Sequence, residues 1–277
     1  MSLTEELVGI ITKEKIGNTK DFIETYDTGL TYFDFRNGQY DPNIDKVITG
    51  LNAGSLTTVV GKSGSAKTSF LVQAACKIVE KYANAQVFHL DFERSTTKIR
   101  VQKLAGWNNE TYQDKYVLLN SNISAESLYK LAKAVAKKKI EKRKELEYDT
   151  GMVDFEGNAV FELPPTIILL DSIAAMQSDT NNEEDELGGQ MSATAQAKTN
   201  NTIIKRLIGS STLEAGNIMI FAINHITTKI DINPMAKTAA DLNFLKQNES
   251  LPGKRWTAWS NSDIRKNTLL IAGNSFN

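Results

Sequence analysis

The stretch Val59-Val60-Gly61-Lys62-Ser63-Gly64-Ser65-Ala66-Lys67-Thr68-Ser69-Phe70 decides the fold of this chain. The β-branched run SLTTVVG, residues 55–61, is typical of a buried strand. The following segment KTSFLVQAACKIVEKY, residues 67–82, carries apolar residues at helical spacing. Between them lies a short loop of small residues. The backbone N–H groups of such a loop, together with those of the helix start, form a cradle for an anion.

The side chains around this loop suit the phosphates of a nucleotide. Lys67 is spaced to reach the β- and γ-phosphates of ATP, and the Thr68 hydroxyl to ligate Mg²⁺. Ala66 stands where the usual pattern has glycine, but alanine is the smallest alternative and still lets the backbone approach. An ordinary turn rich in small residues is the alternative reading. The residues of this segment that we predict to bind the nucleotide are Gly61, Ser63, Gly64, Ser65, Ala66, Lys67, Thr68 and Ser69.

A carboxylate at a second strand end complements the loop. In TIILLDS, residues 166–172, Asp171 follows a fully apolar run, as expected for a central parallel strand. Ligands of open parallel sheets bind at the carboxyl ends of the strands. We therefore expect Asp171 to hold Mg²⁺ through water, with Ser172 beside it. The alternative is an aspartate that merely begins a turn.

Two further strand ends carry polar residues. In HLDFERS, residues 89–95, Asp91 and Glu93 share a face if the strand continues that far, and Glu93 is a candidate to polarise an attacking water. A solvated acidic pair is the equal alternative. Asn224 and His225 end NIMIFAINH, where His225 can hydrogen-bond a γ-phosphate or be merely structural. His89 reads as a packing residue.

The order of segments predicts an α/β fold with a mainly parallel central sheet flanked by helices. The four predicted strands lie within 55–61, 85–93, 164–172 and 217–225, and the helices within 67–82, 95–106, 124–147 and 197–216. A short amphipathic helix is expected in residues 1–22. A very basic helix and a hairpin occupy about 133–163, and their lysines form either a phosphate-binding patch or a solvated face.

Composition narrows the class of protein. The 277 residues are 41% hydrophobic and 23% charged, with a formal net charge of -1, which fits one large globular domain. The balanced charge neither indicates nor excludes a nucleic-acid partner. A single cysteine, Cys76, rules out an internal disulfide framework and favours a reducing compartment. Without an 18-residue apolar run, we expect a cytoplasmic protein with no membrane partner.

Taken together, these motifs resemble the RecA recombinase family, and especially its UvsX-like phage members. The resemblance covers roughly residues 20–253 and rests on TGLTYFD, VVGKSGSAKTS, HLDFE, IILLDSIAAM and IFAINHI, in that order. It implies a RecA-like P-loop NTPase core over 31–253, preceded by an N-terminal helix and linker over 1–30 that contacts a neighbouring protomer. UvsX-like proteins also carry INH and also lack the last glycine of the phosphate loop. For a phage-encoded chain, the compartment is the host cytoplasm.

The resemblance also assigns roles to site residues. Glu93 matches the glutamate that activates water, Asp171 the aspartate associated with Mg²⁺, and Asn224-His225 the pair that couples nucleotide state to DNA binding. The catalytic residues that the resemblance implies are Glu93, Lys67 and His225. Arg100 falls where the family contacts adenine.

Two loops of the family touch single-stranded DNA. The first corresponds to the region of Gly189 and Gln190. The second runs from His225 to about Gly253 and offers scattered lysines and one aromatic residue, which suit a nucleic-acid backbone. An unstructured loop is the alternative for both. The candidates in the second loop are Lys229, Lys237, Phe244 and Lys246.

The resemblance implies an ATP-dependent recombinase that assembles on single-stranded DNA as a filament and promotes strand exchange in recombination and repair. Residues 254–277 do not align with the family's further core strands, so we expect an altered reading frame or a truncated core near Gly253. A hydrolysis-deficient DNA-binding or annealing module of the same fold is therefore an alternative. A RecA-fold helicase, which would form rings, is a third.

Overall fold

The computed structural model describes residues 24–41, 46–153, 157–178, 190–225, 229–231, 246–248 and 268–270. Its central sheet has the strand order β14-β5-β11-β10-β6-β7, and every neighbouring pair is parallel. The predicted α/β class with a parallel central sheet is confirmed. The sheet strands are β5 (Leu56–Gly61), β6 (Gln86–Asp91), β7 (Tyr116–Leu119), β10 (Thr166–Asp171), β11 (Ile218–His225) and β14 (Thr268–Leu270).

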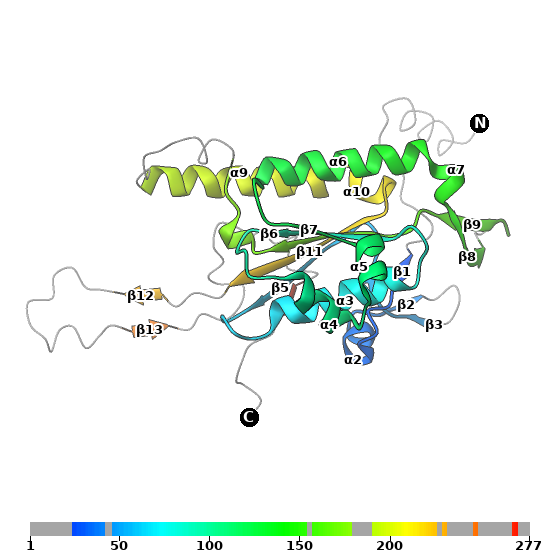
Figure 1. The fold of residues 1–277 in the computed structure, drawn as a ribbon, viewed down its shortest axis with the longest axis horizontal. Helices are drawn as coiled ribbons and strands as arrows, with labels where there is room; N and C mark the ends of the chain where they lie inside the picture. Colours follow the sequence, from blue (N-terminus) through cyan, green and yellow to red (C-terminus); the bar gives the residue numbers. More distant parts are fainter. Residues whose placement is uncertain are drawn as a thin grey trace, which may run out of the picture.

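Helices cover both faces of this sheet (Figure 1). On one face, a buried cluster of apolar side chains packs under α3 (Lys67–Glu80), α4 (Lys98–Ala105) and α5 (Asn109–Lys115). On the other face, a second cluster packs under α6 (Ala125–Glu141), α9 (Gln190–Ile208) and α10 (Thr212–Ala215). Apolar strands buried on both faces are what a helix-covered parallel sheet requires.

The strand β10 shows how the two clusters share one wall. Ile167 and Leu169 belong to the cluster under α3, whereas Ile168 and Leu170 belong to the cluster under α6. Successive side chains of a strand point to opposite faces, so Asp171 at the end of β10 points toward α3. The four apolar residues that predict this strand thus contribute two side chains to each of the two clusters.

Local signals set the helix limits. Thr97, Asn108 and Ser124 each accept a hydrogen bond from a first-turn backbone N–H and cap α4, α5 and α6. Gly106 ends α4 in the left-handed conformation, at φ 72°. The helix predicted for 197–216 is interrupted between α9 and α10, where Gly209 and two serines follow.

Smaller elements surround the core. They are β1 (Thr25–Tyr26), α2 (Thr31–Arg36), β2 (Gln39–Asp41), β3 (Lys46–Ile48), β4 (Leu51–Asn52), α7 (Arg143–Leu146), β8 (Tyr148–Val153), β9 (Ala159–Glu162) and the 3-10 turn η1 (Ile173–Ala175). The strands β8 and β9 pair antiparallel, as predicted for the hairpin that follows the basic helix. The N-terminal helix predicted for 1–22 lies outside the described residues.

Two predicted regions contain short strands. Within 226–253, predicted as a loop, β12 (Lys229–Asp231) pairs antiparallel with β13 (Lys246–Asn248). Within the tail 254–277, β14 pairs parallel with β5 at the edge of the central sheet. The altered reading frame or truncated core stays a prediction. No helix in the described part of the chain combines the length and apolar character that crossing a membrane needs.

Candidate functional site

The loop after β5 leads directly into the first turn of α3. Gly64 has φ 77° and Ala66 has φ 60°, so the chain passes through two left-handed positions in three residues. Ala66 is the residue before the helix and offers no side-chain cap, and the first turn of α3 contains no acidic residue. The partial positive charge of the helix start therefore has neither a side-chain cap nor a first-turn acid to offset it.

Lys67 lies folded over this loop. Its side chain is buried, and its Nζ donates a hydrogen bond of 2.6 Å to the carbonyl oxygen of Lys62. Burial lowers the pKa of Lys67, while the nearby charges of Asp171 and Glu93 act to raise it. The Lys67 ammonium is thus buried near two carboxylates and donates to one neutral carbonyl oxygen. It can exchange this acceptor for an anionic ligand.

Thr68 and Asp171, the two residues predicted at Mg²⁺, lie in direct contact. The Thr68 hydroxyl donates a hydrogen bond of 2.7 Å to Oδ2 of Asp171, joining the start of α3 to the end of β10. Asp171 is buried, and this burial raises its pKa to about 6, with the charges of Glu93 and Asp91 contributing. Two hard oxygen atoms thus lie side by side at the carboxyl edge of the sheet.

Glu93 and His225 approach each other above the end of β10. His225 Nε2 lies 2.9 Å from Oε1 of Glu93, and the Ser172 hydroxyl donates to the same oxygen. The Glu93 backbone N–H donates to the carbonyl oxygen of Asp171 at 3.2 Å. Burial acts to raise the pKa of Glu93, but the hydrogen bonds from Ser172 and His225 outweigh it and lower that pKa. Glu93 is therefore a carboxylate at neutral pH.

The strand order explains this contact. β10 lies between β6 and β11, so residues just beyond β6 and at the end of β11 flank Asp171 from both sides. Asn224 is buried, and its Oδ1 accepts a hydrogen bond of 2.9 Å from the His225 backbone N–H. Arg100 donates to the Ser69 hydroxyl at 3.0 Å, which brings α4 to the first turn of α3.

The strand does not continue to Glu93, so the condition under which Asp91 and Glu93 would share a strand face is not met. β6 ends at Asp91, and the backbone turns there, with the Arg94 N–H donating to the Asp91 carbonyl oxygen at 3.3 Å. Asp91 is not solvated, because it is fully buried and its carboxylate accepts hydrogen bonds from the Ser95 and Thr96 N–H groups. The strand ends here because the Asp91 carboxylate accepts hydrogen bonds from the backbone N–H groups of the following turn, which holds the chain in that turn.

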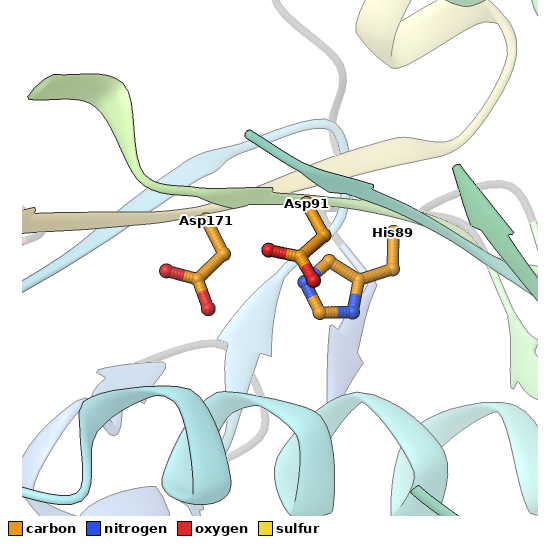
Figure 2. Close-up of side chains that lie close together, drawn as sticks. All are labelled: His89, Asp91 and Asp171. Atoms are coloured by element: carbon orange, nitrogen blue, oxygen red, sulfur yellow. The ribbon is translucent and has the colours of Figure 1, made fainter. Parts of the chain in front are cut away.

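A buried cluster lies beside this site that the sequence reading missed. His89, Asp91 and Asp171 point to the α3 side of the sheet, and their ligand atoms all lie within 4.8 Å of one another (Figure 2). The signal was present, because His89 and Asp91 are two apart on one strand and share a face. His89 does pack in the core as predicted, with Nδ1 lying 2.7 Å from the Tyr116 hydroxyl.

The candidate DNA contacts are placed only in part. Lys229 and Lys246 lie on the β12–β13 ribbon, and Gln190 begins α9, but nothing of their side chains is described. Gly189, Lys237 and Phe244 lie outside the described residues. Both DNA loops stay predictions.

The described site therefore gathers groups from five segments at one edge of the sheet. The loop 61–67 and the start of α3 supply an uncapped helix terminus, Lys67 and Thr68. The ends of β10, β6 and β11 supply Asp171, Glu93 and His225. Neither the models of known protein families nor the sequences of curated proteins gave a match to this chain.

Proposed function

We propose that the chain binds ATP with Mg²⁺ at the carboxyl edge of its sheet and acts as a RecA-like, DNA-dependent ATPase of the recombinase type. One observation carries this proposal. Five polar side chains converge beside the loop 61–67, at the strand ends where parallel sheets bind ligands. They are Lys67, Thr68, Asp171, Glu93 and His225. The α/β fold is compatible with a RecA-like core and also with other nucleotide-binding folds.

The residues present fit Mg²⁺. Mg²⁺ prefers oxygen ligands and is held in nucleotide sites by one or two protein groups together with phosphates and water. The Thr68 hydroxyl and the Asp171 carboxylate lie 2.7 Å apart and are such oxygens. When bound, Mg²⁺ would supply charge neutralisation on the phosphate oxygens.

The chain's own residues supply the remaining roles. The N–H groups of residues 61–68 would hold the phosphates, and Lys67 would leave the Lys62 carbonyl oxygen for a phosphate oxygen. Glu93, ionised at neutral pH, would accept a proton from the attacking water. His225, in contact with Glu93, would sense the γ-phosphate and pass its presence to the segment that follows β11.

The strand-exchange part of this proposal rests on the sequence resemblance to the recombinase family. ATP binding would set the two proposed DNA loops for contact with DNA, the chain would self-associate on single-stranded DNA, and hydrolysis would release it. A filament distinguishes this assembly from a helicase ring in electron micrographs.

A second candidate is a nucleotide-binding module that does not hydrolyse ATP. Oε1 of Glu93 already contacts both Ser172 and His225, and an occupied carboxylate oxygen is a poorer acceptor for a water proton. This arrangement favours ATP-regulated DNA binding or annealing without turnover.

ATP hydrolysis with and without single-stranded DNA tests the proposal. We expect DNA to stimulate hydrolysis, and Glu93→Gln to lower the rate by about 10²- to 10⁴-fold while ATP binding persists. Lys67→Ala should abolish ATP binding, whereas Lys62→Ala, which removes an exposed lysine of the same loop, should retain it. ATP binding with no stimulated turnover would support the second candidate. Equal ATP affinity in the Lys67→Ala and native chains would overturn both.

A further inference from the structure

The buried cluster of His89, Asp91 and Asp171 has the composition of a metal site. The three side chains are 0%, 0% and 1% exposed. β6 presents His89 and Asp91 on one face, and Asp171 of β10 is the register partner of Asp91. Their ligand atoms therefore come together from two adjacent central strands, between the sheet and α3 (Figure 2).

His89 has one ring nitrogen in use and one that is not. Nδ1 lies 2.7 Å from the Tyr116 hydroxyl, while Nε2 is buried and has no hydrogen-bond partner within the described parts of the chain. In Figure 2, Nε2 is the ring nitrogen nearer the carboxyl groups of Asp91 and Asp171. A neutral imidazole whose other nitrogen is held by a hydrogen bond is the form in which histidine ligates metals.

The neighbouring carboxylates have no cation within salt-bridge distance in the described part of the chain. Asp91 and Asp171 form no ion pair with any lysine, arginine or histidine in the described residues, although both are buried. Buried carboxylates are normally paired or coordinate a metal. The unpartnered His89 nitrogen, which faces these two carboxylates, is a second and independent indication that a metal ion binds here.

We propose that His89 Nε2 and one oxygen each of Asp91 and Asp171 bind a divalent transition ion, of which Zn²⁺ is the type. The imidazole nitrogen selects such ions over Mg²⁺, which prefers oxygen alone. Ligand atoms lie about 2.0–2.2 Å from Zn²⁺ and so at most about 4.4 Å apart, which small side-chain rotations would achieve from the observed arrangement. The site shares Asp171 with the proposed Mg²⁺ position, but its other two ligands, His89 and Asp91, take no part in that position, which uses Thr68.

Zinc binding to the full chain, freed of metal and without nucleotide, tests the proposal. We expect calorimetry to show a single tight Zn²⁺ per chain, retained in a large excess of Mg²⁺, and Co²⁺ substitution to give an absorption spectrum with a nitrogen ligand. Because the site is buried, Zn²⁺ should leave slowly when a chelator is added.

Variants assign the ligands. The paired change His89→Phe with Tyr116→Phe replaces both hydrogen-bond partners by apolar rings, so it should preserve packing, and Zn²⁺ affinity should fall about 100-fold or more. The chain has only two histidines, and His225→Gln should leave binding intact. Asp91→Asn, which keeps an oxygen for the Ser95 or Thr96 N–H, is the second variant if the first fails to fold.

Three results would overturn the proposal. They are no Zn²⁺ uptake by the native chain, unchanged affinity in the folded His89 or Asp91 variants, and loss of binding in His225→Gln alone. The Lys67→Ala chain separates this inference from the proposed function, because it should lose ATP binding and keep Zn²⁺ binding. A failure of either proposal is thus recognised without the other.

Discussion

Ala66 carries a Cβ at a backbone position that glycine adopts more easily. Its φ of 60° and ψ of 20° lie in the left-handed region, immediately before the first residue of α3. For an L-residue other than glycine, this conformation costs about 1–2 kcal/mol. Phosphate-loop patterns usually have glycine at this position. The left-handed conformation explains why glycine is usual there, and it means that Ala66 keeps backbone strain that glycine would avoid.

Ala66→Gly should therefore stabilise the protein. Relief of left-handed strain is partly offset by the greater freedom of glycine in the unfolded chain, so we expect the free energy of unfolding to rise by up to about 1 kcal/mol. Denaturant unfolding in the absence of nucleotide measures it. Ala134→Gly, in the exposed middle of α6, is the matched control and should lower stability by about 1 kcal/mol. A loss of stability in Ala66→Gly would contradict the argument.

Asp171 makes stability depend on pH. Burial raises its folded-state pKa from 3.8 to about 6, so between these values the folded chain holds a proton that the unfolded chain has released. Stability contributed by this group is full below pH 3.8 and is lost as the pH rises to about 6, by about 3 kcal/mol. In Asp171→Asn, unfolding measured from pH 4 to 7 without metal should lose this decline. An unchanged slope would show that another group is responsible.

In addition to its apolar packing, the helix α6 is joined to the sheet by one buried lysine. Lys139 Nζ donates to the Pro164 carbonyl oxygen, to the Thr166 hydroxyl at 3.1 Å and to the Asn217 carbonyl oxygen at 3.3 Å. These acceptors lie at the amino ends of β10 and β11, opposite the candidate site. Burial lowers the pKa of Lys139 to about 7. The basic segment of α6, for which the sequence predicts either a phosphate-binding patch or a solvated face, thus includes at least one lysine that is structural.

Removing this lysine should loosen α6 from the sheet. Lys139→Ala removes this donor from the Pro164 carbonyl oxygen and the Thr166 hydroxyl, while the Asn217 carbonyl oxygen keeps the Thr166 N–H, and we expect the free energy of unfolding to fall by about 2–4 kcal/mol. Lys138→Ala is the control, because the Lys138 side chain is 75% exposed and its ion pair with Glu141 is on the surface, so its change should stay within about 0.5 kcal/mol. Thermal unfolding of the two variants compares them directly. Equal effects would show that Lys139 does not anchor the helix.

Several elements could be predicted because their apolar pattern is strong. The runs in β5, β10 and β11, and the helical spacing of α3, specify their structure locally. The segment 109–119 has no comparable pattern, because α5 is a polar seven-residue helix and β7 only a four-residue strand. The contact of His225 with Glu93 could not be read from spacing either, since it depends on β10 lying between β6 and β11.

At the scale of the molecule, β14 covers one edge of the central sheet. Thr268–Leu270 pairs with residues 58–60 of β5, so one side of the strand that leads into loop 61–67 is protected by the tail. The sequence of the tail does not predict this strand, because its pattern does not match the further strands that the resemblance implies. The position of β14 depends on its pairing with β5, which is distant in the sequence, and a local sequence pattern does not reveal such pairing.

Deleting residues 254–277 should expose that edge. The β5 amides that face β14 would lose their partners, so we expect faster hydrogen–deuterium exchange in a peptide covering 56–61. The peptide covering 166–171 is the internal control, because β10 lies between two other strands and should keep its protection. Equal protection of 56–61 in the deleted and full chains would show that β14 contributes nothing to this edge.

The alternation along β10 has a consequence for how this gene tolerates change. Ile167 and Leu169 fill one layer while Ile168 and Leu170 fill the other, so apolar replacements there can be absorbed one layer at a time. A single codon lost or gained inside the strand would reverse both layers together and turn the terminal aspartate away from α3. A library of codon deletions across 166–171 should accordingly contain almost no folded members, while conservative substitutions at the same codons survive.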